Sequence, residues 1–198
     1  AYSMMTSGRL KNAFRINEES DKTRQRYARN PHPQTQQQAR RMVEAEVPVI
    51  QCNMGIVQSW DTHVQHFPRL KNDLLPQTDA GVSALLDDLV GRGLLDQTLV
   101  VVVGEFGRTP KINSQGGRDH WARAMFALMA GGDVAGGQVV GETDDRAGAP
   151  IGKGYSPDDL AASFFQNIGI NSKHEFQTNI GRPINLVRDG KPIAQLFS

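Results

Sequence analysis

Residues 99–103, Leu-Val-Val-Val-Val, constrain the fold of this 198-residue chain more than any other feature. Their β-branched side chains favour extended backbone, and a continuous apolar run of this length is typical of a strand buried on both faces of a parallel sheet. Just before this run, over residues 68–95, leucines and valines recur at helical spacing. Pro76 predicts a kink or a restart within that helix. A helix followed by a buried strand predicts an α/β fold with a mostly parallel sheet.

The first 46 residues are polar and helix-prone, and we expect them to form a helical lead-in to an α/β core over residues 47–198. Acidic residues precede basic ones between Glu18 and Arg29, an order that suits the helix dipole. Prolines at positions 31 and 33 interrupt this helix, because the residue before a proline is disfavoured in the α conformation. The pattern predicts a second helix over 34–46 and a strand over 47–52.

Local signals predict further elements in the second half of the chain. The apolar residues 122–130 predict another central strand. Ser156 is a candidate N-cap with Pro157 in the first turn, which predicts a helix that runs to about residue 168. Asp189 and Gly190 predict a turn between short strands in the tail.

Composition excludes several classes of function. With 22 Lys+Arg against 21 Asp+Glu the net charge is +1, so bulk charge gives no reason to expect nucleic-acid binding. The apolar runs are far shorter than the ~20 residues that a membrane helix requires, so we expect no membrane span. Cys52 is the single cysteine and is interpreted as a core thiol. Residues 1–7 carry neither an initiator methionine at position 1 nor a signal peptide, which predicts a processed chain or a fragment.

Three clusters of residues with catalytic or metal-binding side chains follow expected strands. The first, residues 59–63, holds Asp61 and His63 two positions apart. A carboxylate and an imidazole at this spacing can reach one metal ion from a turn or an extended segment. The alternative is a structural or surface role for both side chains. His66, three positions further on, either assists this pair or is a solvated side chain, and we expect the second.

The second cluster, residues 104–110, follows the valine run directly. Glu105 therefore lies at the carboxyl end of a predicted strand, where ligands of open α/β sheets bind. It is either a metal ligand or a partner of Arg108, and Arg108 can hold an oxyanion through two parallel hydrogen bonds. The alternative is a surface Glu–Arg pair.

The third cluster, residues 116–121, places Arg118, Asp119 and His120 in a row. His120 is a candidate metal ligand, and Asp119 either binds the metal directly or orients the imidazole. Arg118 is a second candidate for oxyanion stabilisation. Because each cluster leaves a predicted strand, together they predict a metal site assembled from loops at one edge of a parallel sheet.

In this order, the clusters and two later segments resemble the C-terminal half of a bacterial family catalogued as domain of unknown function 1501, sulfatase-like proteins placed in the alkaline-phosphatase superfamily. The resemblance spans nearly the whole chain. It rests on Trp60-Asp61-Thr62-His63, Gly104-Glu105-Phe106-Gly107-Arg108-Thr109-Pro110, Gly117-Arg118-Asp119-His120-Trp121, Gly136-Gly137 and Gly181-Arg182-Pro183-Ile184.

The resemblance implies an alkaline-phosphatase-like fold, with a mostly parallel sheet between helices. It implies that Asp61, His63 and His120 hold one divalent metal ion and that Glu105 stands where relatives carry an Asp-His pair. Zinc is the first expectation, and calcium, magnesium or manganese also suit oxygen-rich sites. The implied substrate is an anionic ester, either a phosphate or a sulfate.

Two departures from the superfamily pattern bear on catalysis. Phe106 stands where a second ligand histidine is expected. The N-terminal strand that supplies another metal-binding aspartate and the nucleophile has no counterpart, so residues 1–198 are expected to be the C-terminal portion of a single, incomplete sulfatase-like domain.

The leading hypothesis is a metal-dependent hydrolase of sulfate or phosphate esters in which Arg108 or Arg118 stabilises the oxyanion. The alternatives are a non-catalytic binding or scaffolding module that retains the fold, and an inactive truncated fragment. Family resemblance implies an exported or periplasmic protein, whereas the residues themselves indicate neither location nor oligomeric state.

Overall fold

A computed structural model describes residues 7–28, 31–55 and 59–197. The chain divides into two compact units, the first comprising Ala1–Leu95 and Lys111–Asp119 and the second Asp96–Pro110 and His120–Ser198. The residues on which the signal-peptide interpretation rests lie, apart from Ser7, outside the described part. Among the described residues, no helix is both long enough and apolar enough to cross a membrane.

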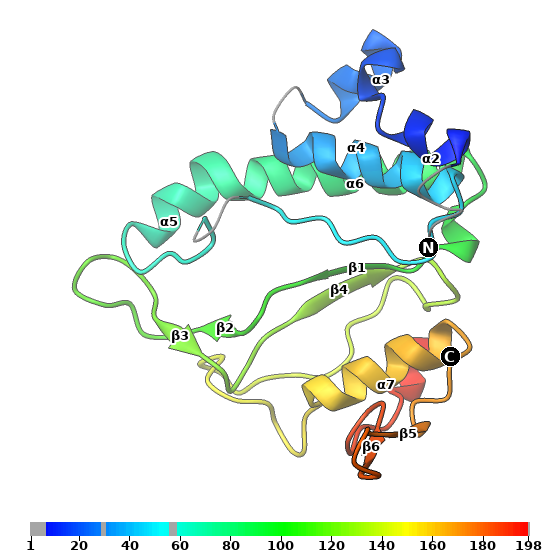
Figure 1. The fold of residues 1–198 in the computed structure, drawn as a ribbon. Helices are drawn as coiled ribbons and strands as arrows, with labels where there is room; N and C mark the ends of the chain where they lie inside the picture. Colours follow the sequence, from blue (N-terminus) through cyan, green and yellow to red (C-terminus); the bar gives the residue numbers. More distant parts are fainter. Residues whose placement is uncertain (1–6, 29–30, 56–58, 198) are drawn as a thin grey trace. The chain divides into compact units, whose positions relative to one another are not determined.

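The first unit is helical. Its two longest helices, α4 and α6, lie side by side (Figure 1). The helix predicted over 34–46 is confirmed but begins earlier, so that both prolines lie in its first turn, where the missing N–H groups have no intrahelical partner to lose. The helices are α2 (Gly8–Ala13), η1 (Ile16–Glu18), α3 (Asp21–Arg26), α4 (Pro31–Glu44), α5 (His66–Arg69), η2 (Leu70–Leu74) and α6 (Leu75–Gly91).

A buried network of charges joins these helices. Arg40 of α4 has only 1% of its side chain exposed and pairs with Glu19 at 2.6 Å and Glu44 at 2.7 Å. Its Nε lies 3.5 Å from Asp88 of α6, which also accepts a hydrogen bond from the Tyr27 hydroxyl. Burial and the Asp88 carboxylate raise the pKa of Tyr27. Because three carboxylates surround one buried guanidinium and one of them, Asp88, belongs to α6, charge pairing joins α4 and α6 in addition to apolar packing.

The predicted interruption at Pro76 is confirmed. A π-helical turn, η2, comes immediately before α6, and Pro76 occupies one of the first positions of α6. A widened turn accommodates the missing proline N–H without breaking the helix.

The strand predicted over 47–52 is wrong. Residues 47–55 form neither helix nor strand. Instead, residues 50–53 line a cavity of about 250 Å³ with side chains of α4, and the Cys52 thiol donates a 3.6 Å hydrogen bond to the Thr35 carbonyl. Cys52 is half-buried, and this burial raises the pKa of its thiol. Of the β-branched residues, Ile50 therefore lies against α4 whereas Val49 is 67% exposed, and no described strand pairs with either.

The second unit combines short strands with one long helix, α7 (Pro157–Asn167) (Figure 1). Its strands form three two-stranded antiparallel sheets, β1–β4, β2–β3 and β5–β6. Two 3₁₀ turns, η3 (Leu95–Gln97) and η4 (Ala194–Phe197), complete the elements. The strands are β1 (Val100–Val103), β2 (Gly107–Arg108), β3 (His120–Trp121), β4 (Ala127–Ala130), β5 (Glu175–Gln177) and β6 (Pro183–Asn185).

The mixture of helices and strands agrees with the predicted α/β class, but the parallel sheet is not found among the described strands. Val100 pairs with Ala130 and Val103 with Ala127, which is an antiparallel register. A parallel pair needs a long crossover, usually a helix, and the chain between β1 and β4 forms the small β2–β3 sheet without any helix. The valine strand is also not buried on both faces, because Val103 is 46% exposed.

The helix predicted from Ser156 is confirmed. The Ser156 hydroxyl accepts from the Asp159 N–H at 3.1 Å, and the Asp159 carboxylate accepts from the Ser156 N–H at 2.8 Å, which completes a capping box. The hairpin turn predicted at Asp189 and Gly190 is wrong. Asp159 also accepts from the Lys191 N–H, and a Cβ on Gly190 would overlap the Asp158 carbonyl. This segment therefore docks on the start of α7.

Candidate metal centre

Asp61 and His63 lie in a tight turn that precedes α5. The Thr62 N–H donates to the Trp60 carbonyl and the His63 N–H to the Asp61 carbonyl, at 3.0 and 3.1 Å. This folding of the backbone brings the Asp61 carboxylate 3.1 Å from Nδ1 of His63. Both side chains are partly exposed, at 34% and 41%. Asp61 and His63, which the sequence predicts to act as a pair, therefore lie side by side. Their polar atoms are accessible to solvent or to an ion.

Between these two residues, Thr62 anchors the turn. It is only 1% exposed, and its hydroxyl is hydrogen-bonded at 2.6 Å to Nδ1 of His66. The expectation that His66 is solvated is wrong, since His66 is 9% exposed and its N–H donates to the Gly116 carbonyl. Gln65 adopts a left-handed conformation, φ +49°, that starts α5 and allows this contact. The buried pair fixes the turn on which Asp61 and His63 stand.

The loop of residues 111–119 adds a second carboxylate to the same unit. Oδ1 of Asp119 lies 4.0 Å from Nε2 of His63 and accepts a 3.0 Å hydrogen bond from Nδ2 of Asn113. The first unit thus brings together Asp61, His63 and Asp119, with one carboxylate near each nitrogen of the imidazole.

Arg118 is connected to the same turn through its backbone, because its N–H donates to the Thr62 carbonyl at 3.2 Å. Its guanidinium lies over the Phe67 ring, 5.5 Å from the centroid. This cation–π contact holds a positive charge on the unit that carries the cluster.

The second unit holds the other predicted site residues. His120 is paired with Arg108 in the β2–β3 sheet, and the Phe106 ring lies 4.4 Å from the His120 ring, tilted by 49°. Glu105 is exposed in the turn between β1 and β2. A Cβ on Gly107 would overlap the Ala124 carbonyl, so the close approach at β2 requires glycine.

His120 follows Asp119 directly, so the chain itself keeps it one peptide bond from the cluster of the first unit. Asp61, His63 and His120 carry the donor atoms that could hold a metal ion. Two imidazoles and a carboxylate are a donor set that suits zinc and, less selectively, manganese. The residues present therefore fit a divalent ion. Glu105 does not belong to this group.

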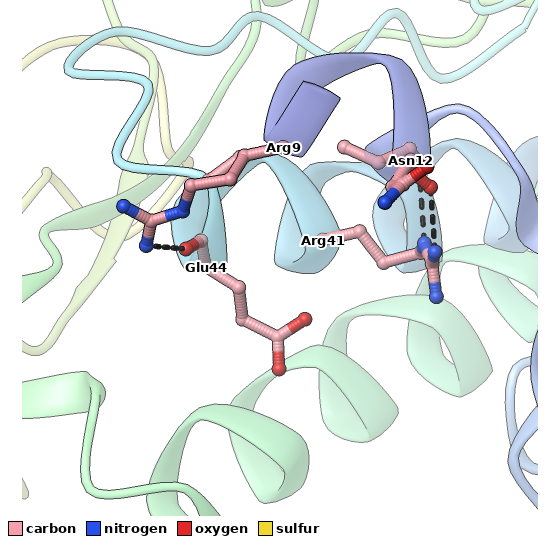
Figure 2. Close-up of a pocket in the computed structure, with 6 residues that line it drawn as sticks. Arg9, Asn12, Arg41 and Glu44 are labelled. Atoms are coloured by element: carbon pink, nitrogen blue, oxygen red, sulfur yellow. Dashed lines mark hydrogen bonds between the residues drawn. The ribbon is translucent and has the colours of Figure 1, made fainter. Parts of the chain in front are cut away.

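A cavity of about 230 Å³ lies elsewhere in the first unit, between α2 and α4 (Figure 2). Two arginines line it, but Arg9 donates to the Glu44 carbonyl at 3.2 Å and Arg41 to the Asn12 carbonyl at 2.6 Å. Their donors hold the two helices together, and we assign no ligand to this cavity.

Two features of the centre are missing from the sequence interpretation. The Thr62–His66 pair joins residues four positions apart across the start of α5, which the pattern of the segment does not indicate. Asn113 carries a weak signal, because an asparagine shortly before Gly116 and Gly117 is typical of a turn stabilised by the side chain. That signal predicts the turn but not its contact with His63.

Comparison with known proteins gives one result. A family model described as "Protein of unknown function (DUF1501)" matches residues 1–197. No curated protein and no solved structure matches the chain.

Proposed function

The chain belongs to the DUF1501 family, and we propose that it carries the metal centre of a hydrolase acting on phosphate or sulfate esters. The observation that supports this most is the cluster of Asp61, His63 and Asp119, in which a carboxylate lies near each nitrogen of one imidazole. In this proposal the chain is the C-terminal portion of a sulfatase-like domain of the alkaline-phosphatase superfamily. The nucleophile comes from a segment without counterpart in residues 1–198.

Asp61, His63 and His120 are the proposed metal ligands. Bound there, a divalent ion supplies Lewis-acid polarisation of an ester oxygen and lowers the pKa of a hydroxyl or water. The protein's own part is to hold the ligands. The buried Thr62–His66 pair fixes the turn of Asp61 and His63, and the pairing of His120 with Arg108 fixes His120 in β3.

Arg108 and Arg118 are the proposed anion-binding side chains. Each is directly connected to a ligand segment, Arg118 through its hydrogen bond to the Thr62 carbonyl and Arg108 through its pairing with His120. A guanidinium can bind two oxygens of a phosphate or sulfate at once, which orients the ester as well as attracting it.

Metal content tests the site. Purified wild-type protein, loaded with Zn²⁺ and dialysed, is expected to retain one ion per chain, and the double variant His63→Ala/His120→Ala none. His174→Ala is the matched control, because His174 contacts Phe176 in the β5–β6 sheet. Equal metal content in wild type and double variant would rule out these ligands.

Turnover tests the reaction. The encoded protein, including whatever sequence flanks these residues, is expected to hydrolyse an aryl phosphate or an aryl sulfate in a metal-dependent manner. Arg108→Ala and Arg118→Ala are expected to lower kcat/KM while metal content stays at the wild-type level. Full metal binding without turnover on either ester would refute the hydrolase.

A second candidate is a metal-containing binding module without turnover. The observation that favours it is the Phe106 ring, whose centroid lies 4.4 Å from that of His120, at a position where the family resemblance implies a further ligand histidine. This candidate predicts binding of inorganic phosphate or sulfate to the metal-loaded protein and no hydrolysis. Metal-dependent turnover eliminates it.

A further inference from the structure

One side chain, Asn113, connects the Asp61–His63 turn with the loop that carries Asp119. Its Nδ2 donates to the His63 carbonyl at 2.9 Å and to Oδ1 of Asp119 at 3.0 Å. Its Oδ1 accepts from the N–H groups of Gln115 and Gly117, at 3.0 and 2.9 Å. An asparagine amide offers two donors and two acceptor sites, and all four are used here.

Backbone contacts hold the same two segments in register. The N–H groups of Gln65 and His66 donate to the carbonyls of Gln115 and Gly116, and Val64 forms an antiparallel bridge with Gly116. Asn113 is thus part of a strip held by backbone hydrogen bonds, which restrict the movement of the chain on either side of it relative to His63.

The geometry of Asp119 follows from these contacts. The oxygen that accepts from Asn113 is also the one that lies 4.0 Å from Nε2 of His63. The other imidazole nitrogen, Nδ1, lies beside the proposed ligand Asp61. Histidines that bind metal through one nitrogen commonly donate from the other to a carboxylate, which fixes the tautomer and the ring orientation.

We propose that Asn113 is a positioning residue of the metal centre, which acts by keeping the Asp119 carboxylate near Nε2 of His63, 4.0 Å away. In this arrangement Asp119 would orient His63, and Nδ1 of His63 would hold the ion together with Asp61. The inference rests on the proposed metal site and deepens it, because it assigns a role to a residue outside the ligand set. Of the two roles left open by the sequence for Asp119, direct ligand and orienting carboxylate, it assigns the second.

Titration with Zn²⁺ or Co²⁺ alone tests the inference. Asn113→Asp is the informative variant, because its side-chain oxygen can still accept from Gln115 and Gly117 while both donations are lost. We expect Asn113→Asp and Asn113→Ala each to weaken binding about 10- to 100-fold and to change the Co²⁺ absorption spectrum. Asn171→Ala is the matched control, since Asn171 accepts from the Lys173 N–H in a similar turn of the second unit. This variant should leave the metal affinity and the Co²⁺ spectrum unchanged.

A double-mutant cycle separates positioning from general destabilisation. If Asn113 acts through Asp119, the double variant Asn113→Ala/Asp119→Asn should bind metal no more weakly than Asp119→Asn alone, whereas independent effects would add. Additive losses, or wild-type affinity in both Asn113 variants, would overturn the inference while leaving the metal site intact. Absence of metal binding in the wild type would instead refute the proposed function itself.

Discussion

At the candidate site, Gly117 is the residue that has the least room for a side chain. A Cβ at this position would overlap the carbonyl carbon and oxygen of His63, whereas a Cβ on the neighbouring Gly116 meets nothing within 4 Å. Gly117 is also buried and donates its N–H to Asn113. The close approach of the two segments therefore depends on the absence of a side chain at this one residue.

We predict that Gly117→Ala abolishes detectable Zn²⁺ binding and lowers the unfolding midpoint. Gly116→Ala is the matched control. Its left-handed φ of +66° costs strain of about 1 kcal/mol but no collision, so metal binding should survive. Calorimetric titration of both variants, with circular dichroism to follow folding, checks this. Wild-type affinity in Gly117→Ala would show that the segments need not approach so closely.

The sequence indicates the proposed ligands more clearly than the residues that support them. Asp61, His63 and His120 are recognisable because aspartate and histidine at these spacings are ordinary metal donors, and their residue types carry the signal. Asn113 contacts His63, 50 positions away, and His66 contacts the distant Gly116. A polar residue in a loop has the same appearance in the sequence whether it is solvated or packed. Such roles depend on the three-dimensional fold and cannot be recognised from local sequence patterns.

Among the helices and strands, α7 is an element that the local sequence predicts correctly. Ser156, Pro157 and Asp159 form a helix start through contacts within four residues, so the sequence alone is sufficient. The antiparallel pairing of β1 with β4 is different, because it depends on how the loop between them folds. The valine run predicts a strand correctly but carries no information on its partner or on the direction of pairing.

The Asp159 carboxylate, which caps α7, makes the stability of the folded protein depend on pH. Hydrogen bonds from the N–H of Lys191 and from Ser156 lower the pKa of Asp159 below its ordinary value of 3.8. A lowered pKa in the folded state contributes stability above the unfolded pKa, and this contribution is lost as pH falls through the folded pKa.

We therefore predict that the wild type is more stable than Asp159→Asn near neutral pH and that this difference shrinks below about pH 4. Urea unfolding of both proteins across this range, followed by circular dichroism, measures the difference. A gap that stays constant down to pH 3 would contradict the assigned role of the carboxylate.

The charge network around Arg40 of α4 leads to a second prediction about the helices. Arg40→Met removes the most buried partner of Glu19 and Asp88, which keep only Arg41 and Arg26, and we expect a loss of at most about 3 to 5 kcal/mol in unfolding free energy. Arg9→Met is the control, because the Arg9–Glu46 pair is 63% and 76% exposed and such pairs contribute at most about 1 kcal/mol. Equal losses in the two variants would contradict a buried network.

At the scale of the whole molecule, the family assignment covers residues 1–197 and the net charge is +1. A nearly neutral chain does not attract anionic esters through its overall field. In the proposed function the attraction is local, and it comes from the bound ion together with Arg108 and Arg118. The metal centre is thus the claim on which the rest of the account depends.

X-ray absorption of the Zn²⁺-loaded protein tests that claim most directly, since it reports the atoms bound to the ion. We predict one ion per chain, bound by two imidazoles and by oxygen, with no sulfur, and a loss of the imidazole signal in His63→Ala/His120→Ala. A sulfur ligand, or the same spectrum in wild type and double variant, would contradict the account.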